Sequence, residues 1–186
     1  AYDASWYRPE QPYSETYAQF HGYICFKQNR QLFPLLRNRL LAGLVLGEDG
    51  WRRQAAEMAL RHGEAIDFRV QHYDAGMEYS QIAWLLCDAR LGASDLLSAA
   101  ETDRLDGLLR EVADAIAANL GIWRGELARM AFSNHRICHM GVLLALGKLL
   151  GDGSLADPVF DRGDDRSFFH YLGGCLHDHG LCYESS

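Results

Sequence analysis

The chain has 186 residues, of which 48% are hydrophobic and 23% are charged, a composition that excludes a disordered segment and predicts a globular domain. The formal net charge is −7 and Lys and Arg form no basic run, so we expect no binding to nucleic acid. The longest apolar run, Ile137 to Gly147, is shorter than the roughly 20 residues that a membrane span needs, so we also expect no membrane association.

The first half of the chain has the spacing of three amphipathic helices. No proline occurs between Leu35 and Asp157, so nothing there forbids a helix interior. Apolar residues recur every three or four positions over Leu35–Val45, Trp51–Val70 and Ala75–Leu91. Each range therefore predicts a helix, and the glycines at positions 47 and 50 predict the end of the first one.

The second half predicts two long helices and a loop. Ser98-Ala-Ala-Glu101 has the spacing of a capping box, and the apolar stripe after it predicts a helix that ends at Gly121. Asn134–Leu150 is almost entirely apolar, which is typical of a helix packed on several sides. Residues 151–165 are rich in Gly and Asp and predict a loop, and Arg166–His177 is compatible with a last helix.

The chain is therefore expected to be all-α, with about seven helices in series joined by short turns. No repeat of fixed period is present, which favours an irregular bundle or a toroid of antiparallel hairpins over a regular solenoid. We expect residues 1–186 to form a single helical domain, and residues 1–30 are an aromatic-rich N-terminal segment within it.

Ser133-Asn134-His135-Arg136 is the first candidate site. Three polar side chains at the start of a helix combine hydrogen-bond donors with the positive end of the helix dipole, a combination that suits a carboxylate. A simpler interpretation is that Ser133 or Asn134 caps the helix and His135 faces water. Spacing alone leaves both interpretations open.

Metal binding has two candidate ligand sets. His135 and His139 are four residues apart, a spacing of helical zinc ligands, but Arg136 stands where the zinc-helix motif has glutamate and would repel a cation. The C-terminal set has a spacing that matches no common structural zinc pattern. It comprises Cys175, His177, His179 and Cys182. We expect neither set to bind metal.

Two aromatic residues lie beside carboxylates in this part of the sequence, at Tyr73 and Asp74 and at Glu78 and Tyr79. Rings stack on the apolar faces of sugars and carboxylates accept hydrogen bonds from sugar hydroxyls, so this segment is a candidate sugar-binding site. The alternative is that Asp74 caps the helix and that the first turn is solvated.

Three segments, taken in order, resemble the heparinase II/III-like polysaccharide lyases, which include the oligoalginate lyases. Ala75–Ser80 followed by Ala83–Leu86 is similar to the sGxE…W helix of that family. Ser133-Asn134-His135 with its following helix is similar to the NH helix. Gly180–Ser186 is similar to the DGxxYExSxxYH motif.

The resemblance implies an incomplete (α/α) toroid and a lyase that cleaves an acidic polysaccharide or oligosaccharide by β-elimination at a uronic acid, without a cofactor. It implies catalytic roles for Asn134 and His135. It implies substrate contacts for five further residues, namely Arg136, Glu78, Tyr79, Tyr183 and Glu184. The catalytic tyrosine of the family is expected just beyond Ser186, so the chain is expected to be the N-terminal part of a longer enzyme that is periplasmic or secreted.

Two other functions compete with the lyase. A glycoside hydrolase on a similar toroid would need two carboxylates, for which Asp74 and Glu78 are the nearest candidates. A non-catalytic carbohydrate-binding scaffold would keep the cleft without chemistry. The sequence does not define which uronate would be bound.

Overall fold

The computed structural model describes residues 15–69, 75–122, 134–163, 167–169 and 172. Side chains are described from residue 31 onward within these ranges, except at 75–77, 121–122 and 134–135. These residues are helical or lie in turns and loops, and none of them is in a strand. The expectation of an all-α chain is therefore confirmed for the part that the structure describes.

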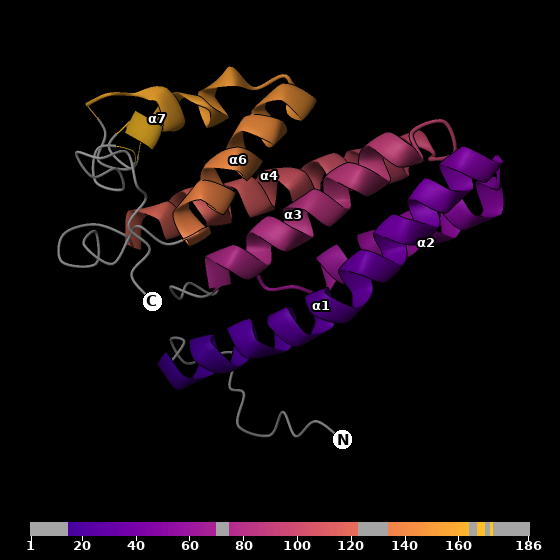
Figure 1. Cartoon of the computed structure of the whole chain (residues 1–186), viewed down its shortest axis with the longest axis horizontal. Helices are drawn as coiled ribbons and strands as arrows, with labels where there is room; N and C mark the ends of the chain where they lie inside the picture. Colours follow the sequence, from indigo (N-terminus) through magenta and orange to yellow (C-terminus); the bar gives the residue numbers. More distant parts are fainter. Residues whose placement is uncertain (1–14, 70–74, 123–133, 164–166, 170–171, 173–186) are drawn as a thin grey trace, which may run out of the picture.

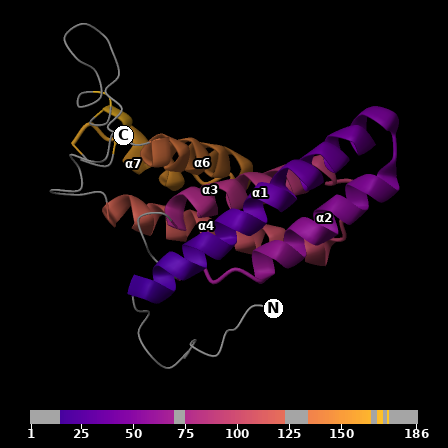
Figure 2. The same ribbon diagram turned by 60° about the horizontal axis from the view of Figure 1, so that its bottom comes forward.

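The helices form a layered stack in which successive long helices run back and forth (Figure 1). The elements in chain order are α1 (Glu15–Leu46), α2 (Asp49–Glu64), α3 (Ala75–Gly92), α4 (Ala99–Ile122), α6 (Asn134–Leu150), a 3-10 turn (Gly153–Leu155) and α7 (Asp157–Phe160). The pair α1 and α2 packs on one side of α3, and α6 packs on α3 and α4 on the other side (Figures 1 and 2).

Helix α1 is much longer than the sequence predicts. It begins at Glu15 and contains Pro34, whereas the expected helix began after the proline at Leu35. A proline inside a helix removes one hydrogen bond and costs roughly 3 kcal/mol. Leu32 and Phe33 pack against the same core as Leu36, so tertiary burial on both sides of the proline offsets this cost.

Helix α2 is shorter than predicted. It ends at Glu64 and not at Val70, and Ala65 caps it through backbone bonds to the carbonyls of Gly63 and His62. Ile66 and Phe68 fit a helical period but lie in the following loop, where they contact the core around α3 and α4. Burial of their side chains satisfies the apolar pattern without continuing the helix.

The predicted capping box at the start of α4 is confirmed. The Ser98 backbone N–H donates to Glu101 Oε2 at 2.9 Å, and the Glu101 backbone N–H donates to Ser98 Oγ at 3.3 Å. The Arg53 guanidinium also bonds the Glu101 carboxylate, and these contacts lower the pKa of Glu101 to about 2.

Two glycines end helices as the sequence indicates. Gly47 and Gly151 have φ of 71° and 67°, the left-handed region that other residues avoid. The next residue in each case donates its N–H back into the helix, from Glu48 to Gly43 O at 2.8 Å and from Asp152 to Gly147 O at 2.9 Å. These are Schellman-type caps for α1 and α6.

The core has two parts. The larger part lies between α3, α4 and α6 and includes Ile82, Leu86, Leu105, Leu109, Val112, Ile116, Leu143 and Leu146. The smaller part joins α1, α2 and α3 through Leu36, Ala56, Ala59, Leu85, Ala89 and Ala93. The many alanines in the second part allow close approach of three helices, and the larger aliphatic residues fill the wider space in the first.

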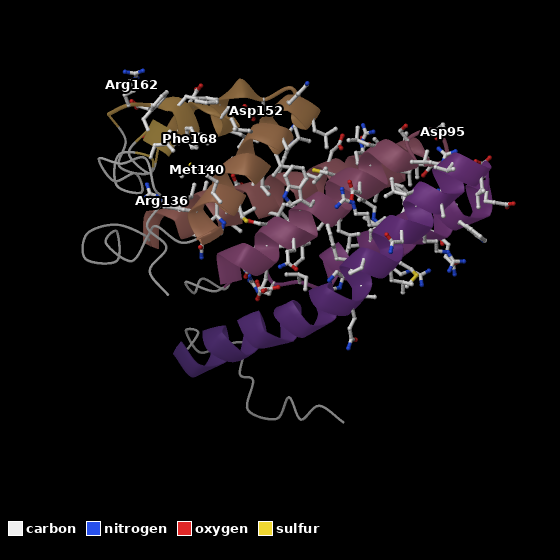
Figure 3. All side chains as sticks on the ribbon, viewed as in Figure 1. Asp95, Arg136, Met140, Asp152, Arg162 and Phe168 are labelled. Atoms are coloured by element: carbon white, nitrogen blue, oxygen red, sulfur yellow. The ribbon has the colours of Figure 1, made fainter. Side chains whose placement is uncertain are left out.

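Arginines of α2 hold the tips of the hairpins together. Arg52 donates through Nε to the Gly92 carbonyl at 2.9 Å and pairs with Asp95, which Figure 3 shows at this end of the stack. Arg53 pairs with Glu101 at the start of α4. These contacts tie the α1–α2 turn to the α3–α4 turn.

The predicted loop 151–165 contains short helical elements. A 3-10 turn covers Gly153–Leu155 and α7 covers Asp157–Phe160, where Val159 is buried against the larger core. Most of the expected last helix, Arg166–His177, lies outside the described residues. Within the parts that the structure describes, no helix has both the length and the apolar character to span a bilayer.

Candidate functional site

The helix that carries the first candidate site begins where the sequence predicts. α6 starts at Asn134, so Asn134 and His135 occupy its first turn. The N–H groups of a first helical turn have no partner within the helix and favour anions. The side chains of Asn134 and His135 are outside the described part of the structure, so their predicted catalytic roles stay predictions.

A buried hydrogen-bonded chain joins three helices close to this point. Ser80 Oγ of α3 lies 3.1 Å from His139 Nδ1 of α6, and His139 Nε2 lies 3.0 Å from Asn119 Oδ1 of α4. The exposed fractions are 2% for Ser80 and 0% for the other two residues. Because His139 is one helical turn after His135, this chain fixes the first turns of α6 against α3 and α4.

The two contacts occupy both nitrogens of the His139 ring. An amide oxygen can only accept, so Nε2–H donates to Asn119, and Nδ1 shares a hydrogen bond with the Ser80 hydroxyl. His139 is therefore a structural link between helices and does not offer a nitrogen to a metal beside His135.

Arg136 and Glu78 are buried, with exposed fractions of 1% and 4%. Arg136 lies at the start of α6 on the same side as Met140, a core residue one turn further on (Figure 3). Both side chains have interactions within the protein. The predicted substrate contacts of Arg136 and Glu78 are therefore not made by freely exposed side chains in this structure.

Tyr79 is a core residue. Its ring has an exposed fraction of 0% and meets the Phe68 ring edge to face at a centroid distance of 5.3 Å. Its hydroxyl donates to the Asp67 carbonyl at 3.1 Å. The alternative of a solvated first turn is wrong for Glu78 and Tyr79, and the Tyr79 ring presents no open face on which a sugar could stack.

The structure brings two of the predicted segments to one end of the stack. The Ser80–His139 bond places the second turns of α3 and α6 side by side, and α4 ends beside them (Figure 1). Hence the segment around Glu78 and the helix that begins at Asn134 are neighbours. Several predicted residues lie outside the described residues, namely Tyr73, Asp74, Tyr183, Glu184, Cys175, His177, His179 and Cys182.

An open pocket of about 580 Å³ lies between the α2–α3 loop and α4. Its lining includes Glu64, Asp67, Glu111, Asp114 and one cation, Arg69. Glu64 pairs with Arg104 and Asp67 pairs with Arg69, so the excess negative charge of the lining is that of Glu111 and Asp114, and it disfavours a polyanion. This pocket is therefore a poor place for an acidic polysaccharide. Across the described side chains, no three His, Cys, Asp or Glu residues are grouped to hold a metal ion.

Ser80 and Asn119 were not among the residues predicted for the site. A signal for Asn119 was present, because it continues the buried stripe of Val112 and Ile116 at helical spacing and is polar where the pattern requires an apolar residue. Ser80 carries no comparable signal, since a small hydroxyl is ordinary on either face of a helix.

Comparison with protein-family models, with curated proteins and with solved structures found no match for this chain.

Proposed function

We propose that the chain is part of a polysaccharide lyase, a carbon–oxygen lyase that cleaves a uronic-acid-containing polysaccharide by β-elimination. The proposal rests on the resemblance of three ordered segments to the heparinase II/III-like lyases. The observation that carries it furthest is the Ser80–His139 hydrogen bond, because it makes neighbours of two segments that resemble the family separately. The third segment lies outside the described residues.

The proposed reaction removes the C5 proton of a uronate, breaks the C4–O bond and leaves a C4=C5 double bond. The C5 proton is weakly acidic beside an ionised carboxylate, so the carboxylate must be neutralised by hydrogen bonds. Asn134 and the N–H groups of the first turn of α6 are the proposed donors. A donor of this kind, which strengthens as charge develops, contributes about 3–4 kcal/mol to the transition state.

His135 is the proposed base or second neutralising group, because an imidazole titrates near neutral pH. Arg136 is proposed to act at a distance: its charge is buried one residue further on and adds positive potential at the start of α6. The resemblance further implies a tyrosine that protonates the leaving oxygen or acts as both base and acid.

The proposed fold of the complete enzyme is an (α/α) toroid to which the hairpins α1–α2 and α3–α4 would contribute. The antiparallel order of these four helices is compatible with such a toroid. We further propose a periplasmic or secreted location, as the resemblance to the family implies.

The test offers alginate, heparan, chondroitin and hyaluronan to the natural protein that contains this chain. A lyase generates ultraviolet absorbance, because the new double bond is conjugated with the carboxylate. Asn134→Ala and His135→Ala are each expected to reduce the rate by at least about 100-fold. Lys148→Ala is the matched control, since Lys148 is exposed at the opposite end of the same helix.

The outcomes separate the competing functions. New reducing ends without ultraviolet absorbance, lost in Glu78→Gln, would contradict the lyase in favour of a glycoside hydrolase. Retention of a polymer without any product would favour the carbohydrate-binding scaffold. Absorbance that persists in Asn134→Ala at the rate of Lys148→Ala would remove the proposed site from the start of α6.

A further inference from the structure

The tip of the α1–α2 hairpin carries an apolar surface. Large hydrophobic residues with an exposed fraction of at least 40% are concentrated there, namely Leu35, Leu41, Leu44, Val45, Leu46 and Trp51. A groove of about 350 Å³, here called the tip groove, is lined by two of these residues, Leu35 and Trp51, together with Asn38, Arg39 and Ala42. Exposed apolar residues that line a groove mark an interaction surface.

Arg39 is the one charged residue in the lining of the tip groove. Its guanidinium carbon lies 6.0 Å from the centre of the Trp51 ring, and its Nε atom is covered but has no hydrogen-bond partner among the described residues. Among the residues that the structure describes, no carboxylate pairs with Arg39. An apolar groove that holds an unpaired, partly covered cation fits an apolar side chain with a carboxylate nearby.

The chain itself has both features beside the groove. Leu46, with an exposed fraction of 64%, is four residues after Ala42 and therefore on the same face of α1. Glu48 follows the Gly47 turn, and its carboxylate makes no hydrogen bond or ion pair with another described residue. One short stretch of the chain therefore contains the tip groove, an exposed apolar side chain (Leu46), a cation (Arg39) and an anion (Glu48).

We propose that the tip groove binds the same surface of a second copy of this chain, with the two α1 helices antiparallel about a twofold axis. In this arrangement Leu46 of each copy lies over Ala42 of the other, whose small side chain leaves space for it. Arg39 precedes Ala42 by three residues, and Glu48–Asp49 follows Leu46 by two to three. The same alignment therefore places Arg39 opposite the Glu48–Asp49 turn of the second copy.

Sedimentation velocity over a range of concentrations tests the proposal directly. The wild-type chain is expected to show a monomer–dimer equilibrium. Arg39→Glu and Glu48→Arg should each weaken the dimer by at least about tenfold, because each places like charges opposite one another. The double variant Arg39→Glu/Glu48→Arg should dimerise again, and an equimolar mixture of the two single variants should form a heterodimer.

Two further variants test the apolar contact. Leu46→Asp should give a monomer, whereas Phe160→Asp, which changes an exposed aromatic residue of α7 away from the tip, should not. Circular dichroism of each variant confirms that the helices persist. A wild-type chain that stays monomeric, or two single variants that dissociate without recovery in the double variant, would overturn the proposal.

Discussion

The substitution His139→Leu tests the view that a buried polar chain fixes α6 on the rest of the stack. Leucine fills most of the space of the imidazole but makes neither of its hydrogen bonds, which are 3.1 Å to Ser80 and 3.0 Å to Asn119. A typical hydrogen bond contributes about 1 kcal/mol net, and a buried polar group that loses its partner costs about 1–3 kcal/mol. The gain in apolar burial offsets part of this loss.

The expected result is a decrease of about 2–4 kcal/mol in the free energy of unfolding, or roughly 5–15 °C in Tm for a chain of this size. Ser80→Ala removes one of the two bonds and should cost about half as much. In the double variant the two losses should not add, because both substitutions remove the same hydrogen bond. Chemical denaturation followed by circular dichroism measures all three values.

Met140→Leu is the control, because Met140 is the next residue along α6, is equally buried, and tolerates a swap of similar volume at a cost below about 1.5 kcal/mol. If His139→Leu is as stable as Met140→Leu, or more stable than the wild type, the hydrogen-bonded chain does not hold the helices together. If the losses of unfolding free energy from Ser80→Ala and His139→Leu add in full, the two residues act independently, and the Ser80–His139 hydrogen bond does not contribute to stability.

Two glycine substitutions and one histidine substitution test packing and burial elsewhere. Gly92→Ala should destabilise by about 1–3 kcal/mol, since its new Cβ would collide with Leu40 Cδ2, whereas Gly107→Ala, with open space around it in α4, should stabilise by about 0.5–1 kcal/mol. Thermal denaturation that gave both variants a change of the same sign would refute this packing. Burial lowers the pKa of His62 below its usual value near 6.5, so the unfolded chain binds the proton first and stability should fall as the pH drops below about 6.5 towards the folded pKa. His62→Gln should remove up to about 1.4 kcal/mol per pH unit of this slope, and an unchanged slope in urea titrations would contradict the burial.

Signals confined to a few neighbouring residues predicted the structure well. The Ser98–Glu101 capping box, the glycine at position 47 and the end of α6 at Gly151 all depend on hydrogen bonds within one or two turns. Such bonds form in the same way in many folds, so the local sequence contains most of the information. Pro34 inside α1 and the early end of α2 depend instead on distant partners, which a period of apolar residues does not reveal.

The sequence predicted which segments form the candidate site but not the contact that brings them together. Glu78 and Asn134 belong to segments that the sequence singles out, but the bond that makes those segments neighbours is between Ser80 and His139. Burial also changed the interpretation of Tyr79, because an aromatic residue beside carboxylates fits both a sugar platform and a core position. The covering loop at Asp67 decides for the core position, and its conformation has no signature in the sequence.

Exposed ion pairs and a buried hydrogen bond hold different parts of the stack together. At the hairpin tips, Arg52 and Arg53 use charge pairs that are partly exposed and that salt screens. Near the start of α6, the hydrogen bond between His139 and Asn119 is fully buried, where salt screens little. A buried hydrogen bond of this kind holds α6 in one position on α4. This suits the start of α6, where the proposed chemistry requires donors of fixed position beside an anionic substrate.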